Sequence, residues 1–388
     1  MSAVKIDPRL KEWATPRQAE YIDAVNSTSY TRAAKDFKVC LKTIQGSITG
    51  LKKRAAKHGY APEHDMTKTV PEPFLVKGTS TLYDEDGKAR LQWVKTTLDQ
   101  EKVEQAIRDA VDALAQEVVR LPPLPAPKST EAQLVNLYTL TDCHVGMRSW
   151  AQETGEDWDL EIAERTLTGA FQHMIGAAPP AEVGFVNQLG DFLHYDGLAP
   201  ITPTGGHLLD ADGRYPKVVK VAVRILRAMI DSALARHKKV VVLMAEGNHD
   251  IAGSVWLRHL FSLLYENEPR VEVMETSMAY YAYQHGKTML AFHHGHLSKT
   301  GALPLLFAAQ YPQVWGATTR RYCHTGHRHH VEEKEHSGMI VIQHPTIAAR
   351  DAYAARGGWV ADRSMTAITY HSKHGQVGRT TVVPEMLL

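Results

Sequence analysis

The sequence predicts an α/β protein that carries a small helical domain at its N-terminus. From Val135 onward, short apolar runs alternate with helical stretches, which is the pattern of a layered α/β fold. Residues 15–58, in contrast, have the pattern of short helices. The length of 388 residues supports more than one domain, because domains typically hold about 100–200 residues.

Composition excludes several classes of protein. Apolar residues make up 44% and charged residues 22%, which is typical of a globular chain rather than a disordered one. No apolar run, Val240–Ala245 included, is longer than six residues, whereas a membrane span needs about 18. The first residues, MSAVKIDPRLKEW, lack the apolar region of a secretory signal. Three cysteines (Cys40, Cys143 and Cys323) argue against a disulfide framework, so we expect a cytoplasmic protein without a membrane partner.

The charge is unevenly distributed along the chain. Residues 1–60 hold 12 Lys and Arg against 5 Asp and Glu, a balance of +7, while the remainder carries −6. A basic N-terminal segment on an acidic body suggests contact with an anionic partner. A basic surface that serves only solubility remains the alternative.

Three short helices are predicted in this basic segment. Thr15 at the N-cap and Pro16 at the first position begin the first helix, and Ser29 or Thr31 caps the second. In the third, apolar residues recur at steps of four and three, which places them on one face. The predicted helices cover residues 16–25, 31–37 and 41–57.

The third helix has polar residues opposite its apolar face. A short second helix, a tight turn and a longer third helix resemble a helix-turn-helix DNA-binding module over residues 1–60. A packing or oligomerisation module is the alternative. The candidate DNA-binding residues on the polar face are Lys42, Gln45, Thr49 and Lys52.

Residues 61–130 are predicted to connect the two domains. Prolines give residues 60–77 the composition of a linker. A β-hairpin is predicted next, with its turn at Asp84-Glu85-Asp86-Gly87, and it would act as a wing beside the three helices or simply as a brace. Residues 98–120 predict an amphipathic helix whose apolar face needs a partner, either its own domain or a second subunit. We expect a dimer, for which this helix offers a surface. The proline-rich residues 122–127 end that helix and form a stiff spacer.

Polar clusters follow the first four predicted strands of the third domain, residues 131–388, and a fifth cluster precedes the last predicted strand. Ligands bind at the carboxyl ends of strands in sheets of this kind. The predicted strands are Leu134–Leu140, Val183–Leu189, Val240–Ala245, Met289–Phe292 and Met339–Ile342. The clusters are Thr141-Asp142-Cys143-His144, Gly190-Asp191, Gly247-Asn248-His249-Asp250, His293-His294-Gly295-His296 and Gly326-His327-Arg328-His329-His330.

These clusters have the composition of a metal site. Nine of the 21 histidines lie between His293 and His344, in a chain with few cysteines. Imidazole and carboxylate ligands without thiolate favour borderline divalent ions. Alternate side chains of an extended segment share a face, so we expect Asp142 and His144 to point one way and Cys143 the other.

The ordered set D-x-H, GD, GNHD, HGH and GHxH resembles the calcineurin-like metallophosphoesterases over residues 134 to about 346. The resemblance implies a β-sandwich flanked by helices. The domain order further resembles phage-encoded members with an N-terminal helix-turn-helix, relatives of the SbcD-type DNA exonucleases. For such a protein the location would be the host cytoplasm.

The resemblance also implies roles for residues of this sequence. One metal would be held by Asp142, His144, Asp191 and His329. The other would be held by Asp191, Asn248, His294 and His327. Two divalent ions are implied, Mn²⁺ first, with Fe²⁺, Zn²⁺ or Mg²⁺ as alternatives. His249 would act on the scissile phosphate as acid or hydrogen-bond donor, oriented by Asp250.

Other residues near the motifs have open roles. His294 is chosen over His293 because the family ligand precedes the glycine. His194 could contact substrate, and no role is assigned to His296 or His330. Three arginines near the last motif could hold phosphates or remain solvated: Arg320, Arg321 and Arg328.

The predicted function is therefore that of a metal-dependent hydrolase of phosphoester bonds. The leading hypothesis is a two-metal phosphodiesterase that cleaves DNA, an exonuclease whose nucleophile is metal-bound hydroxide. The alternative is a phosphoesterase on small substrates, such as a cyclic nucleotide or a phosphomonoester, with the N-terminal module used for assembly. A non-enzymatic DNA-binding regulator is disfavoured because the ligand set is complete.

Overall fold

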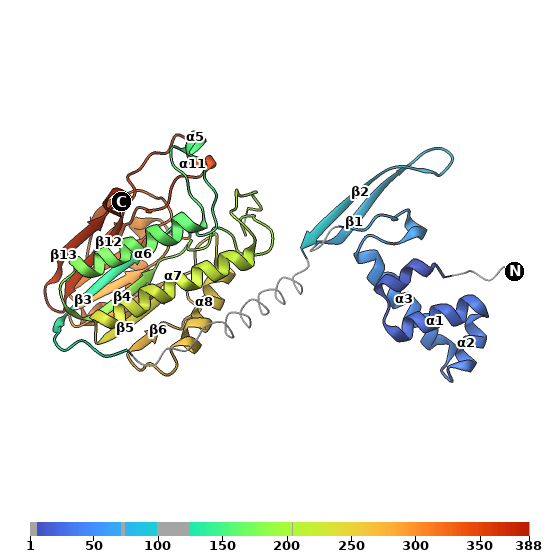
Figure 1. Ribbon diagram of the computed structural model, residues 1–388, viewed down its shortest axis with the longest axis horizontal. Helices are drawn as coiled ribbons and strands as arrows, with labels where there is room; N and C mark the ends of the chain where they lie inside the picture. The colour runs from blue at the N-terminus through green and yellow to red at the C-terminus, as the bar shows by residue number, and fades with distance from the viewer. Residues whose placement is uncertain (1–5, 71–73, 99–123, 204, 388) are drawn as a thin grey trace. The chain divides into compact units, whose positions relative to one another are not determined.

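The computed structural model describes residues 6–70, 74–98, 124–203 and 205–387. The chain divides into two compact units, residues 1–106 and 107–388, whose elements are labelled in Figure 1. The amphipathic helix predicted over 98–120 falls almost entirely outside the described residues, so the helix and the dimer stay predictions. No helix in the described part of the chain is long and apolar enough to cross a membrane.

The first unit contains the three predicted helices. A capping box starts the first of them: the Thr15 side chain accepts from the Gln18 N–H, and the Gln18 side chain accepts from the Thr15 N–H. Ser29 is the cap of the second. Ile22, Ile44 and other apolar residues of the three helices form one buried core. The elements are η1 (Pro8–Trp13), α1 (Pro16–Ser27), α2 (Tyr30–Asp36), α3 (Leu41–Lys57) and η2 (Pro62–His64).

The β-hairpin is longer than predicted and belongs to the same unit. Strands β1 (Phe74–Tyr83) and β2 (Ala89–Leu98) pair antiparallel, so part of the expected linker is strand. The Tyr83 hydroxyl donates to Asp65 Oδ2 at 3.0 Å, and Gln92 Nε2 donates to the His64 carbonyl at 3.2 Å. The hairpin is thus hydrogen-bonded to the segment that follows α3.

The second unit contains two β-sheets. The six-stranded sheet has the order β13-β12-β3-β4-β5-β6, and the five-stranded sheet has the order β10-β11-β9-β8-β7. The first comprises β3 (Glu131–Leu140), β4 (Ala181–Gln188), β5 (Lys239–Met244), β6 (Val271–Val273), β12 (Met365–His371) and β13 (Gly375–Val382). The second comprises β7 (Tyr281–His285), β8 (Thr288–Phe292), β9 (Arg320–Thr325), β10 (Glu332–His336) and β11 (Met339–Gln343).

The two sheets pack face to face and form the core of a sandwich. Leu137, Phe185 and Leu243 of the first sheet share one buried cluster with Leu290 and Phe292 of the second. The rings of Phe185 and Phe292 stack with centroids 5.0 Å apart. The side chains that alternate with these along each strand, such as Tyr138 in β3, point to the other face of the sheet and pack against helices.

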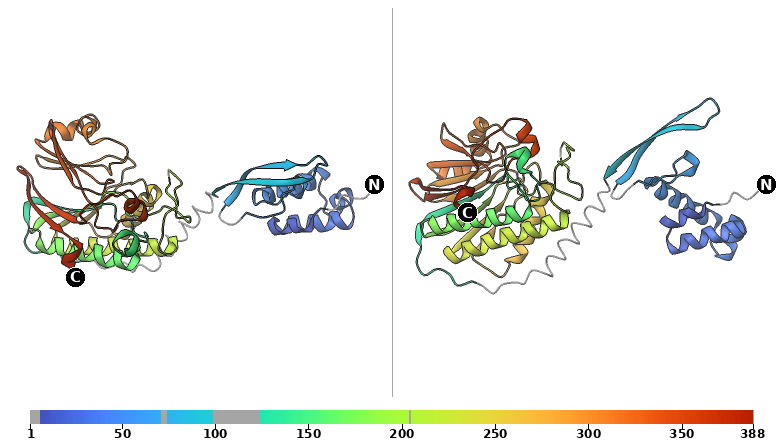
Figure 2. Two further views of the ribbon diagram at one scale, coloured as in Figure 1. Left: turned by 90° about the horizontal axis from the view of Figure 1, so that it is seen from above. Right: turned by 45° about the horizontal axis from the view of Figure 1, so that its top comes forward.

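Helices cover the outer faces of both sheets, as Figures 1 and 2 show. Apolar residues of α6, α7 and α8 pack on the six-stranded sheet, and those of α9 and α10 pack on the other. The predicted β-sandwich flanked by helices is therefore confirmed. The helical elements are α5 (Ala151–Thr154), α6 (Leu160–Ala177), α7 (Tyr215–Arg236), α8 (Ile251–Leu264), η3 (Thr300–Ala302), α9 (Leu303–Gln310), α10 (Pro312–Ala317), α11 (Ala352–Arg356) and η4 (Pro384–Leu387).

Five strands deliver the polar clusters to one region. β3, β4 and β5 are parallel neighbours, so their carboxyl ends share an edge of the first sheet. β8 and β9 are parallel neighbours in the second sheet. Each of these five strands ends within three residues of a predicted metal ligand or its motif.

Candidate metal centre

The strand ends bring six predicted ligands into two adjoining clusters. Donor atoms within each cluster lie within 4.8 Å of one another. His294 Nε2 connects the clusters, because it lies 3.2 Å from Asp191 Oδ2 and 3.9 Å from Asp142 Oδ1. The clusters are Asp142, His144 and His329, and Asp191, His294 and His327.

Three buried ligand atoms in this region fit a cation. Asp142 Oδ1, Asn248 Oδ1 and His294 Nε2 are buried and have no hydrogen bond in the structure. A buried polar atom without a partner costs free energy, so such atoms normally have a partner in the native protein. Carboxylate, amide and imidazole donors together suit a divalent ion. The residues present therefore fit a metal centre.

Each carboxylate is held by one oxygen, which leaves the other for an ion. Asp142 Oδ2 accepts from the Thr141 hydroxyl at 2.6 Å and from the His327 N–H at 2.9 Å. Asp191 Oδ1 accepts from the His249 N–H at 2.8 Å. The free oxygens, Asp142 Oδ1 and Asp191 Oδ2, face the histidines. Such outer hydrogen bonds fix the direction of metal ligands. No role for Thr141 follows from the sequence pattern.

The histidine tautomers also suit metal binding. His294 Nδ1 donates to the Leu189 carbonyl at 2.9 Å, so Nε2 is the nitrogen that faces the carboxylates. Burial lowers the pKa of His144 far below its usual range, which keeps that ring neutral. Its Nε2 lies 3.4 Å from His329 Nε2, and 3.3 Å separates its Nδ1 from His194 Nδ1.

The two carboxylates attract positive charge strongly. Burial alone would lower the pKa of His294, but the nearby Asp191 and Asp142 outweigh it and raise the pKa to about 10. Burial likewise opposes the charged form of His329, and Asp142 again raises its pKa. Because a proton and a metal ion compete for the same nitrogen, a bound metal must displace these protons.

The backbone of the site is left-handed at most of the ligands. Among the described residues, seven non-glycine residues have positive φ, and five of them are predicted ligands. Each such residue costs on the order of 1–3 kcal/mol, and such strain concentrates at functional sites. The D-x-H segment is therefore not extended, contrary to expectation, because β3 ends at Leu140 and the chain turns. The expected side-chain directions are nevertheless confirmed, since Asp142 and His144 share a cluster and Cys143 packs in the apolar core. The five are Asp142 (52°), His144 (44°), Asp191 (49°), His327 (71°) and His329 (58°).

Two motif glycines are required by close approach to the carboxylates. A Cβ at Gly247 would lie 2.0 Å from Asp191 Oδ1, and a Cβ at Gly326 would lie 2.0 Å from Thr141 Oγ1. Both distances are impossible for real atoms. The GNHD and GHxH motifs therefore begin with glycine because the loop backbones press against the side chains that hold the ligands.

Asp250 has a different role from the expected one. Its carboxylate is fully buried and accepts backbone N–H bonds from Asp191, Phe192, Leu193 and Gly247. These four donors saturate its two oxygens, so it braces the loops that carry Asp191 and Asn248. The His249 ring is oriented instead by the His194 carbonyl, which accepts from His249 Nδ1 at 2.8 Å.

His144, His194 and His249 form a third cluster of donor atoms. It contains no carboxylate, and its His194 is engaged within the protein by His144 and by the backbone of Asp210. Burial lowers the pKa of His194 to about 3, so the ring is neutral. His194 thus links a metal ligand to the residue expected to act on the phosphate.

The remaining candidates are placed outside the two clusters. His293 donates from Nδ1 to the Ala279 carbonyl at 3.0 Å, in agreement with the choice of His294. Arg321 lies over the Trp315 ring and binds backbone carbonyls, and His330 is exposed. His296 and Arg328 line a cavity beside His327, together with Lys299, to which no sequence motif points.

Replacing the carboxylate of the Asp191 cluster should reduce metal binding. Asp191→Asn removes the negative charge that faces His294, so bound metal should fall and turnover should drop by more than about 100-fold. Elemental analysis of the purified protein measures the metal. Asp362→Asn, which replaces an exposed aspartate, is the control and should keep both bound metal and turnover. Full metal content in Asp191→Asn would contradict this assignment.

Adding one methyl group at Gly247 should disrupt the same loop. Gly247→Ala forces a collision with Asp191, so we expect a loss of stability of about 1–3 kcal/mol and loss of bound metal. Gly176→Ala in α6 is the matched control, since a Cβ there meets nothing within 4 Å. Helix propensity predicts that the control gains about 0.5–1 kcal/mol. Thermal unfolding measures the stability of the two variants. Equal changes in stability in both would refute the packing argument.

Solved structures match parts of this chain at low sequence identity. No protein-family model and no curated protein sequence matches the chain. Among solved structures, a predicted phosphoesterase from Streptococcus pneumoniae TIGR4 is 11% identical, covering 66% of this chain and 92% of that one, with a TM-score of 0.29. An archaeal phosphodiesterase is 12% identical, with coverages of 64% and 99% and a TM-score of 0.31. Vps29 from Entamoeba histolytica, complexed with Zn²⁺, is 16% identical, with coverages of 64% and 98% and a TM-score of 0.26. Phosphoesterases are thus among the solved structures that match the chain, and the low identities and TM-scores leave the site's own geometry as the basis for its function.

Proposed function

We propose that the protein is a two-metal phosphodiesterase that hydrolyses DNA, and that it acts as an exonuclease. The observation that carries the hydrolase proposal is the pair of clusters around Asp142 and Asp191, with buried donor atoms that lack partners. Divalent ions held there would lower the pKa of a shared water and offset the charge that develops on the phosphate. Mn²⁺ is our first choice of metal, because the donors are oxygen and imidazole without thiolate.

Residues of the chain have separate roles in this proposal. Oxygen ligands come from Asp142, Asp191 and Asn248. Nitrogen ligands come from the four predicted histidine ligands, His144, His294, His327 and His329. His249 contacts the phosphate: its Nδ1 is fixed to the His194 carbonyl, which leaves Nε2 as the nitrogen available to substrate. A ring fixed in this way can donate a hydrogen bond or a proton at one defined position. Asp250 and His194 position these groups.

DNA is proposed as the substrate because of the first unit. Lys42, Gln45 and Thr49 are exposed on α3, as predicted. Lys52 is also exposed but is partly engaged by Glu63, whose Oε1 lies 3.3 Å from Lys52 Nζ. The positive balance of residues 1–60 adds a favourable electrostatic term for a polyanion. The two units would then divide binding and chemistry between them.

A substrate panel tests the proposal directly. Purified protein with Mn²⁺ is offered linear duplex DNA, circular single-stranded DNA, a cyclic dinucleotide and a chromogenic diester. Cleavage of the linear duplex but not the circle supports an exonuclease. Hydrolysis of the cyclic dinucleotide or the chromogenic diester alone would favour the small-substrate enzyme and contradict DNA as substrate.

Removing the His249 ring should separate metal binding from catalysis. In His249→Ala we expect near-normal metal content and a fall in turnover of about 10²–10⁴-fold, the range for a positioned proton donor. His259→Ala, an exposed histidine on α8, is the matched control and should remain active. Loss of metal in His249→Ala would show instead that this histidine is a ligand.

The polar face of α3 can be tested in the intact chain. Combined Lys42→Ala, Gln45→Ala and Thr49→Ala substitutions should weaken duplex DNA binding. The log–log salt slope should fall by roughly one unit for each DNA phosphate that the variant no longer neutralises. Hydrolysis of the chromogenic diester should survive, because its chemistry lies in the second unit. Lys373→Ala, an exposed lysine in that unit, is the control. Unchanged DNA affinity would remove α3 from the proposal.

A further inference from the structure

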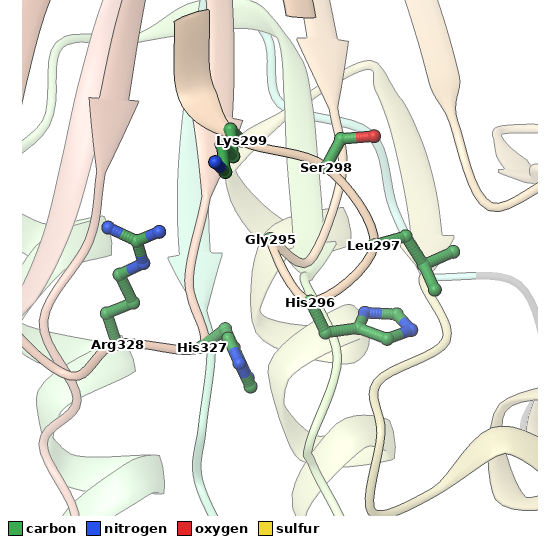
Figure 3. Close-up of a pocket in the computed structure, with 7 residues that line it drawn as sticks. All are labelled: Gly295, His296, Leu297, Ser298, Lys299, His327 and Arg328. Carbon is green, nitrogen blue, oxygen red and sulfur yellow. The ribbon is translucent and has the colours of Figure 1, made fainter. Parts of the chain in front are cut away.

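A small cavity adjoins the metal centre on the side of His327. Its volume is about 190 Å³, and Figure 3 shows the seven residues that line it. His327 belongs at the same time to the Asp191 cluster, and the His296 ring lies 5.3 Å from the His294 ring. The cavity is therefore continuous with the proposed reaction site. The lining residues are Gly295, His296, Leu297, Ser298, Lys299, His327 and Arg328.

The lining of this cavity is cationic and contains no acidic residue. Lys299 and Arg328 are both exposed, and neither makes an ion pair among the described residues. Arg379 of the same unit, in contrast, pairs with Glu333. His296 adds a buried Nδ1 without a hydrogen bond. The charged heads of Lys299 and Arg328 are thus available to an anion.

The two loops that form the cavity are joined to each other. The Gly326 N–H donates to the His294 carbonyl at 2.8 Å, and a Cβ at Gly295 would lie 3.1 Å from the Gly326 carbonyl oxygen. Ser298 is tied to Tyr280 by a hydrogen bond of 2.7 Å between their hydroxyls. Lys299 and Arg328 are therefore carried on loops fixed to each other and to the metal ligands.

The size of the cavity limits what it can hold. Pockets for whole small-molecule ligands measure about 300–1,000 Å³, so this one suits a single group rather than a nucleotide. Arginine and lysine both bind phosphate oxygens, arginine through its planar fork. A phosphate is the anion that a phosphodiesterase substrate would bring to this position.

We propose that Lys299 and Arg328 hold the phosphate next to the scissile one, so that the enzyme selects substrates with at least two consecutive phosphates. The inference rests on the proposed function, which it deepens by naming a specificity site. On a DNA strand the second phosphate belongs to the neighbouring nucleotide. On a nucleoside diphosphate it would belong to the small molecule itself.

The test compares substrates that differ in phosphate number. The intact protein with Mn²⁺ is offered a thymidine trinucleotide, which has two phosphodiesters, and the dinucleotide, which has one. The wild type should have the higher kcat/KM for the trinucleotide. Lys299→Gln and Arg328→Gln should each reduce the ratio of the two kcat/KM values by roughly tenfold, the loss expected for one charge-assisted hydrogen bond.

Matched variants separate a local role from a change in overall charge. Lys334→Gln removes an exposed lysine of β10 outside the cavity and should leave the ratio unchanged. Arg328→Lys keeps the charge and should restore part of the preference. Metal content is measured in Arg328→Gln, because Arg328 lies between His327 and His329. A ratio that stays at the wild-type value in both glutamine variants would overturn the inference.

The outcomes also distinguish this inference from the proposed function. If the wild type cleaves both oligonucleotides but the variants keep its preference, the cavity site is wrong and DNA as substrate stands. If it cleaves neither, but hydrolyses a nucleoside diphosphate with the same sensitivity to Lys299→Gln, the phosphate site stands and DNA as substrate is wrong.

Discussion

Two buried carboxylates of like charge govern the second unit. Asp142 and Asp191 are 0% and 2% exposed, and both lie close to the same histidine nitrogen, His294 Nε2. Taking two such charges out of water costs several kcal/mol per ion unless cations compensate them. Backbone N–H groups and the Thr141 hydroxyl satisfy one oxygen of each. The other oxygens require positive charge, which raises the pKa of the neighbouring histidines and makes the region suitable for divalent ions.

Packing of the two sheets brings the carboxylates and the histidines together. Asp142 and Asp191 follow strands of the six-stranded sheet, whereas His294, His327 and His329 follow strands of the five-stranded sheet. Neither sheet alone holds a complete cluster, so the apolar packing between the sheets fixes the distance between carboxylate and imidazole. Gly326 serves the same end, since it lets the loop after β9 approach Thr141 and Asp142 of the other sheet. Gly247 instead brings together two loops of the six-stranded sheet.

The sequence predicted the parts of the fold that depend on local pattern. The third helix of the first unit has the predicted bounds, Leu41–Lys57, and all five predicted strands of the second unit are present. Six strands of the described part of this unit are not predicted. Buried polar residues interrupt the apolar pattern of β9 and β12, and β6, β7, β10 and β13 are mostly exposed or half-buried. The ligand residues followed from motif order, but their backbone did not: a D-x-H segment is extended only if its strand continues, and β3 ends at Leu140. The role of Asp250 depends on backbone donors from distant segments, which no local pattern contains.

Some histidines of the histidine-rich stretch are not candidate metal ligands, so composition alone overestimates the number of ligands. His324 and His344 lie in the same stretch as the ligands but are buried in a separate chain of hydrogen bonds. Burial lowers the pKa of both rings, so each has one N–H and one lone pair. The rings form a continuous chain of hydrogen bonds: 3.1 Å separates the Tyr370 hydroxyl from His324 Nε2, 2.9 Å separates His324 Nδ1 from His344 Nε2, and 3.0 Å separates His344 Nδ1 from the Thr366 hydroxyl. Each ring nitrogen is satisfied within protein, which leaves no lone pair for an ion. These histidines therefore connect β9, which precedes His327 and His329, to β12 of the other sheet, and they support the ligands without being ligands.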